Sequence, residues 1–89
     1  MAGRLTVRQV QTLGPGMHGD GDGLYLHVNA AGARSWILRY QVNKRRREMG
    51  LGAFPLFGLA QARERAQEAR RLLADGIDPI EHRKGRTAA

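Results

Sequence analysis

The sequence predicts an α+β domain: a three-stranded antiparallel sheet with one C-terminal amphipathic helix packed on one face, plus a short N-terminal helical turn. Stretches near residues 24–29 and 35–42 alternate between apolar and polar residues, which is typical of half-buried strands. Residues 59–75 instead repeat apolar side chains every three or four positions, as in an amphipathic helix. With 89 residues, the chain has room for one domain, which we place at residues 1–80.

The N-terminal helical turn is predicted from its capping residues. Thr6 is placed to accept from the amide of Gln9, and the Gln9 side chain can complete the capping box. Leu5 and Val10 have the spacing of a hydrophobic staple. Residues 14–16, Gly-Pro-Gly, should end this helix, and residues 19–23 are expected to form a turn-rich loop rather than a strand.

Three strands are predicted, at residues 24–29, 35–42 and 45–51, and the last two are joined by a tight turn at Asn43-Lys44. One face of this sheet should carry the large apolar side chains, which are Leu24, Leu26, Val28, Trp36, Leu38, Tyr40, Val42, Met49 and Leu51. Burial of each of the larger of these side chains contributes roughly 1.5–3 kcal/mol. The opposite, open face should present Tyr25, His27, Ile37, Arg39, Gln41 and Arg46.

The helix at 59–75 should cover the apolar face. Its stripe contains alanines at 62, 66 and 69, which permit close approach to a sheet. Gly58 is the expected N-cap, and Gly76 is suited to the left-handed position that follows the helix. Pro79 prevents its continuation, so residues 81–89 are interpreted as a basic linker or tail toward a core-binding or catalytic region that this chain does not contain.

Charge points to a polyanionic partner. There are 15 Lys and Arg residues against 8 Asp and Glu, giving a net charge of +7. The window from Arg34 to Arg47 holds six basic residues and no acidic one. The absence of cysteine excludes disulfides, thiolate zinc sites and a cysteine nucleophile, and the histidines do not have metal-ligand spacing, so no metal or cofactor is expected. The sequence shows neither a membrane span nor a signal-peptide apolar region, which predicts a cytoplasmic protein.

We expect the open face to bind duplex DNA. A β-ribbon fits the major groove, where Arg39 can contact guanine and Gln41 can contact adenine. The remaining candidate DNA-binding residues are Tyr25, His27, Lys44, Arg45, Arg46 and Arg47, with those at the turn and rim meeting phosphates. Three alternatives stay open: a solvated sheet face, an RNA- or polyanion-binding module with Tyr25 stacking a base, and a protein-interaction module that uses Arg63 and Arg70 on the helix.

Several motifs occur together and in order over residues 5–83. They are Gly23-Leu24-Tyr25-Leu26-His27-Val28, Arg34-Ser35-Trp36-Ile37-Leu38-Arg39-Tyr40, Gly50-Leu51-Gly52-Ala53-Phe54-Pro55, Leu59-Ala60-Gln61-Ala62-Arg63 and Gly76-Ile77-Asp78-Pro79. As a set they resemble the N-terminal arm-type DNA-binding domain of phage- and island-encoded tyrosine recombinases (P4-like integrases). The sequence departs from that family at Gly58, where Ser or Thr is usual, and at Phe54, where Tyr is frequent.

This resemblance implies sequence-specific binding at arm-type sites that flank an attachment site, in support of DNA integration and excision. It also implies other integrase protomers or DNA-bending proteins as further partners. The recombinase catalytic set includes a His-x-x-Arg motif, which the sequence lacks, and the tyrosines at 25 and 40 fall inside predicted strands. We therefore expect this chain not to cut DNA.

Overall fold

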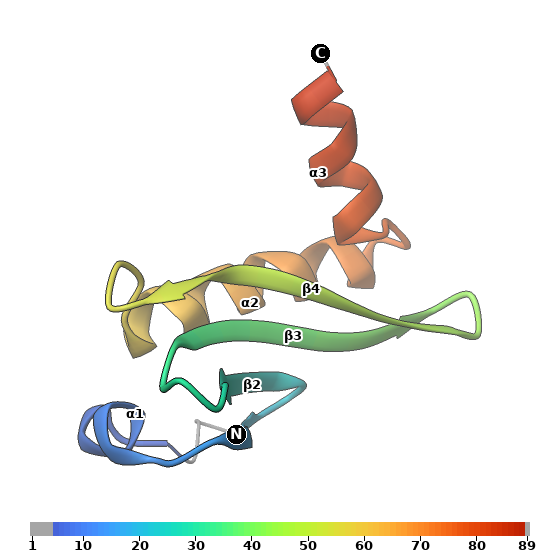
Figure 1. Cartoon of the computed structure of the whole chain (residues 1–89). Helices are drawn as coiled ribbons and strands as arrows, with labels where there is room; N and C mark the ends of the chain where they lie inside the picture. Colours follow the sequence, from blue (N-terminus) through green and yellow to red (C-terminus); the bar gives the residue numbers. More distant parts are fainter. Residues whose placement is uncertain (1–4, 89) are drawn as a thin grey trace.

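The chain forms a four-stranded antiparallel sheet with one long helix across a face and shorter helices at both ends (Figure 1). The computed structural model describes residues 5–88, with side chains as far as Arg83. In chain order the elements are α1 (Val7–Thr12), β1 (Gly16–Gly21), β2 (Leu24–Val28), β3 (Arg34–Val42), β4 (Arg45–Phe54), α2 (Leu59–Ala74) and α3 (Pro79–Ala88). The predicted α+β class is confirmed, while residues 1–4 and 89 of the predicted domain and tail lie outside the described part.

The prediction of three strands was wrong, because the segment expected to be a loop forms β1. This strand pairs with β2, with Met17 opposite His27 and Gly19 opposite Tyr25. Its sequence, GMHGDG, has no apolar alternation, so nothing in its composition favours a strand. The ladder with β2 and the buried carboxylate of Asp20 hold it instead, since Asp20 accepts from the Leu5 amide at 2.9 Å and from Arg63.

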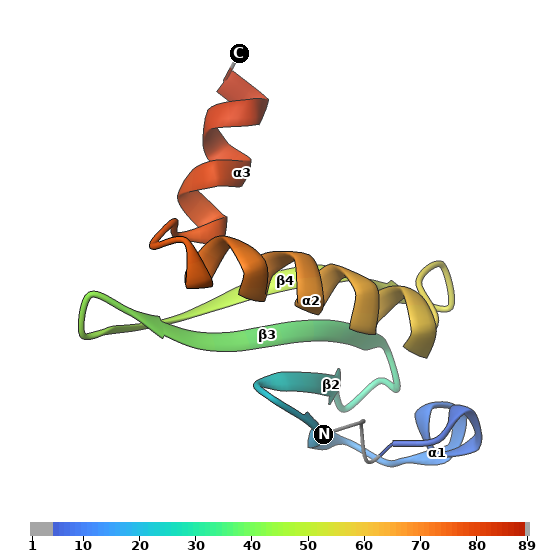
Figure 2. The same cartoon turned by 180° about the vertical axis from the view of Figure 1, so that it is seen from behind.

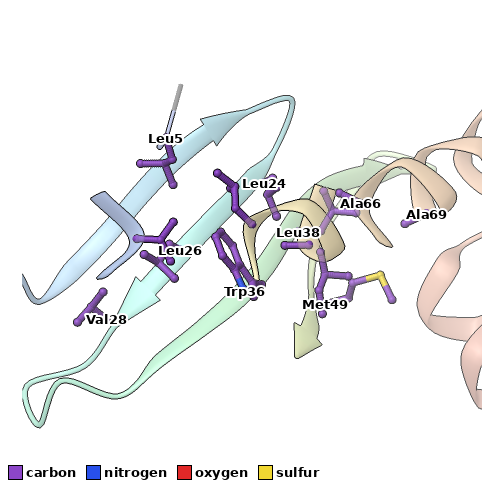
Figure 3. Packing of buried hydrophobic residues seen from close by; sticks show 13 residues of the cluster. Leu5, Leu24, Leu26, Val28, Trp36, Leu38, Met49, Ala66 and Ala69 are labelled. Atoms are coloured by element: carbon purple, nitrogen blue, oxygen red, sulfur yellow. The ribbon is translucent and has the colours of Figure 1, made fainter. Parts of the chain in front are cut away.

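The core lies between α2 and the predicted apolar face of the sheet. Figure 3 shows Leu24, Leu26, Trp36 and Leu38 of β2 and β3 gathered with alanines of α2. Trp36 is fully buried, and its indole nitrogen donates to the Phe57 carbonyl at 2.7 Å. The alanines at 62, 66 and 69 are buried as predicted, so the helix backbone lies close to the sheet.

The residues predicted to cap the start of α1, the start of α2 and the end of α2 are confirmed. Thr6 and Gln9 form the capping box of α1, and Gly58 is the N-cap of α2. At the C-terminal end of α2, Gly76 has a φ of +78°, and the amide of Ile77 donates to the Leu72 carbonyl at 2.8 Å. Gly76 thus occupies the left-handed position predicted for it, and the bond from Ile77 completes a Schellman arrangement.

The tail was predicted as a linker, but it is helical from Pro79 to Ala88. Asp78 caps this helix, because its side chain accepts from the Ile80 amide at 3.0 Å. Pro79 occupies the first helical position, where a missing N–H costs nothing. Pro79 therefore begins a second helix beyond the end of α2, and α3 rises away from the layers formed by α2 and the sheet (Figure 2).

Candidate nucleic-acid interface

The most prominent projection of the sheet is a two-stranded ribbon made by residues 39–48. The last residue of β3 that pairs with β2 is Leu38, whereas β3 and β4 stay paired as far as Val42 and Arg45. Asn43 and Lys44 form the turn with φ values of 50° and 64°, which confirms the predicted two-residue connection. The ribbon extends beyond the other elements of the sheet (Figure 1), and an antiparallel ribbon has the width that the major groove of B-DNA admits.

The tip of the ribbon carries three exposed cations: Lys44, Arg45 and Arg46. Within the described residues, none of the three forms an ion pair or a side-chain hydrogen bond. The ribbon tip is therefore a patch of positive charge that the protein itself does not neutralise.

The open face of the ribbon carries the side chains expected to contact bases. Gln41 lies opposite Arg46 in the β3–β4 ladder, and Arg39 lies opposite Glu48. Arg39 donates from Nε to Glu48 Oε2 at 2.5 Å, and its Cζ lies 4.8 Å from the centroid of the Tyr25 ring. The hydrogen bond to Glu48 raises the pKa of Arg39 above its usual range, so this guanidinium is charged at any physiological pH.

His27 belongs to the same face but lies away from the ribbon. Its partners across the ladder are Met17 of β1 and Ser35 of β3, four positions along β3 from Arg39. The structure therefore groups Tyr25, Arg39, Gln41 and Arg46, and it leaves His27 at the other end of the open face.

Arg47 lies on the opposite side of the sheet, facing α3. Its Nη1 donates to Asp78 at 2.7 Å and to Glu81 at 3.1 Å, while the Tyr40 hydroxyl donates to Asp78 at 2.5 Å. Burial alone would raise the pKa of Asp78, but bonds from Tyr40, Arg47 and the Ile80 amide outweigh it and lower that pKa. Burial and the bond to Asp78 raise the pKa of Tyr40 to about 12. Arg47 thus fastens the start of α3 to the sheet.

Other basic side chains are also bound to their own chain. Arg34 donates to the carbonyls of Val10 and Leu13 at 2.7 and 2.6 Å, and so satisfies the C-terminal end of α1. Arg63 pairs with buried Asp20 at 2.9 Å, and Arg70 donates to the Asp22 carbonyl at 3.1 Å. These three arginines therefore serve the fold, and Arg63 and Arg70 each have a partner within the chain.

Glu48 is the residue of this site that sequence reasoning assigned no role. The turn at Asn43-Lys44 was predicted correctly. Counting outward from this turn along both strands places residue 48 opposite residue 39. The pairing of a carboxylate with the central arginine of the open face therefore follows from the turn position alone.

Comparison with known proteins decides the family. Residues 5–86 match the family described as the arm DNA-binding domain. The chain belongs to this family. It is 37% identical over 84 residues to the integrase of Shigella phage Sf6, covering 90% of this chain and 22% of that protein. It is also 40% identical over 82 residues to the integrase of Enterobacteria phage P4, covering 85% of this chain and 19% of that protein.

A third relative, prophage integrase IntS of Escherichia coli K12, is 37% identical over 84 residues, which is 90% of this chain and 22% of the relative. The chain therefore spans about a fifth of the length of these integrases. Membership of the arm DNA-binding family supports DNA binding as the role of this chain.

Membrane-spanning helices and metal-binding clusters are both absent from the described residues, 5–88. None of their helices is long and apolar enough to cross a membrane. No group of three or more His, Cys, Asp or Glu side chains among them could hold a metal ion.

Proposed function

We propose that this chain binds duplex DNA sequence-specifically at the arm-type sites of an integrase, through the open face and tip of its β-ribbon. It thereby anchors a site-specific tyrosine recombinase during integration and excision, without cutting DNA itself. The observation that carries the proposal is the ribbon tip, where Lys44, Arg45 and Arg46 are exposed without protein partners among the described residues.

The proposed role of each side chain follows from its position on the ribbon. Arg39 and Gln41 lie on the open face two residues apart, so both side chains point the same way and can contact neighbouring base edges. The cations of the ribbon tip meet the phosphates, which fix the register of the protein on DNA but carry no sequence information. Tyr25 lies beside Arg39, His27 lies at the far end of the open face, and Arg47 acts from the other side of the sheet by holding α3 in place.

The experiment is a salt-titrated binding series with a duplex selected by the wild-type chain from a random-sequence pool, and with its scrambled counterpart. Contacts with about five phosphates give a log–log slope near −4 to −5. Arg45→Ala should weaken binding to both duplexes and reduce that slope by about one. Arg39→Ala should cost about 10–100-fold on the selected duplex and little on the scrambled one.

Arg71→Ala is the matched control, because Arg71 is an exposed arginine of α2, which covers the other face of the sheet. The variant should keep the wild-type slope. If Arg71→Ala and Arg45→Ala weakened binding equally, net charge rather than the ribbon would determine affinity. That result would contradict the proposal.

A further inference from the structure

The Arg39 side chain contacts two other residues of the sheet, Glu48 through a hydrogen bond and Tyr25 through a cation–π contact. We propose that Glu48 and Tyr25 are positioning residues that fix the Arg39 guanidinium for a two-point contact with one guanine. The proposal rests on the proposed function, namely that the open face of the ribbon binds duplex DNA. It assigns a role in sequence specificity to Glu48, although its carboxylate is negatively charged like the DNA phosphates.

The ion pair between Arg39 and Glu48 leaves the end of the guanidinium available. Glu48 bonds to Nε of Arg39, so the pair does not occupy the terminal nitrogens Nη1 and Nη2. A guanidinium recognises guanine by donating two parallel hydrogen bonds to O6 and N7. An arginine bonded through Nε can still make that contact, and the bond removes rotational freedom from its long side chain before DNA arrives.

An aromatic ring lies beneath the guanidinium. The Tyr25 ring supports Arg39 by a cation–π contact of 4.8 Å. Gly19 lies opposite Tyr25 in β1, and a Cβ built on Gly19 would lie 3.4 Å from that ring. Gly19 therefore places no side chain of its own against the ring. Tyr25 pairs with Ile37, and Arg39 pairs with Glu48 two positions further along β3, so the guanidinium lies diagonally over the Tyr25 ring.

A carboxylate on a DNA-binding surface needs a physical reason. Within the strands that the structure describes, Glu48 is the only acidic side chain on the open face. Its ion pair is exposed, at 48% for the Arg39 side chain and 52% for Glu48, and such pairs contribute little to folding stability. A carboxylate also repels phosphates. Neither stability nor general DNA affinity accounts for Glu48, whereas orientation of Arg39 does.

The test measures base discrimination rather than affinity alone. The wild-type chain selects a motif from a pool of random-sequence duplexes, and binding is then measured with single G·C to A·T replacements in that motif. We expect wild type to discriminate about 5–150-fold at the position that Arg39 contacts. Glu48→Gln should reduce discrimination there to less than about 3-fold and should bind scrambled DNA at least as well as wild type.

Glu64→Gln is the matched control, since it makes the same charge change at an exposed position of α2. It should leave discrimination unchanged. The double variant Arg39→Ala/Glu48→Gln should discriminate no worse than Arg39→Ala alone, because Glu48 acts through Arg39. Circular dichroism melting of each variant should give the wild-type melting temperature, because the substituted side chains are exposed.

Three outcomes overturn the proposal. Full discrimination by Glu48→Gln with tighter binding of every duplex would make Glu48 a purely repulsive charge. Loss of discrimination at a different position from Arg39→Ala would make Glu48 a direct base contact. Absence of any preference in wild type would remove the specificity that Glu48 is proposed to serve. The response of the Arg45→Ala salt slope reports separately on the proposed function, so the two failures are distinguishable.

Discussion

The two faces of the sheet use arginine in different ways. On the side that α2 and α3 cover, Arg47 and Arg63 are tied to the carboxylates of Asp78 and Asp20. On the open side, Arg46 has no ion pair within the described residues. Arg39 bonds to Glu48 through Nε, so its terminal nitrogens take no part in that bond. The same side chain therefore stabilises the fold on one face and is available to a ligand on the other.

Strand alternation offers a direct way to test this difference, because neighbouring residues of one strand point to opposite faces. Trp36 and Ile37 form one such pair in β3, and Arg46 and Arg47 form another in β4. Each pair compares a covered position with an open one while the position along the strand stays nearly constant.

The largest expected effect is on stability at the first pair. Trp36→Ala removes the largest fully buried side chain and its bond to Phe57, which should lower the free energy of unfolding by about 3–5 kcal/mol. A domain of this size is stable by as little as about 5 kcal/mol, so the variant should keep no more than about 2 kcal/mol and should show a measurable unfolded fraction at 37 °C. Ile37→Ala, on the half-buried open face, should cost only about 1 kcal/mol. Urea unfolding followed by circular dichroism measures both, and equal losses would contradict the assignment of the faces.

The second pair separates stability from binding. Arg47→Ala leaves Asp78 and Tyr40 without their cation, so it should lower the melting temperature. Arg46→Ala should leave the melting temperature unchanged and reduce the slope of the salt dependence of DNA binding by about one. Thermal melting and salt-titrated binding of both variants check the contrast. A melting temperature that fell equally in the two variants would show that Arg46 has a structural partner.

Much of this architecture could be predicted from local patterns. The alternation in 24–29 and 35–42, the turn at Asn43-Lys44 and the alanine stripe of α2 each reflect a few neighbouring residues, and each was predicted correctly. Strand β1 could not be predicted in this way, because its glycine-rich sequence has no apolar alternation. Its extended conformation depends on pairing with β2. Its carboxylate, Asp20, is buried only because Leu5 and Arg63 arrive from distant parts of the chain.

Helix α3 is a different kind of omission, since its signal was present in the sequence. Asp78 at the N-cap, Pro79 at the first helical position and Glu81 in the first turn are all typical of a helix start. The role of Arg47 could not be predicted from its neighbours. Its partners Asp78 and Glu81 are more than thirty residues away, and only the packing of α3 against the sheet brings them together.

The smallest expected effect is a pH dependence at the junction of Arg47 and α3. The folded chain lowers the pKa of Asp78 below its usual 3.8, so the unfolded chain binds more protons as the pH falls. The stabilisation is present above about pH 4 and is lost as the pH falls through the lowered pKa. Asp78→Asn keeps a good N-cap while removing the charge. This variant should therefore lose less stability than wild type between pH 5 and pH 2, as measured by thermal melting, whereas Asp75→Asn at an exposed position should behave as wild type does.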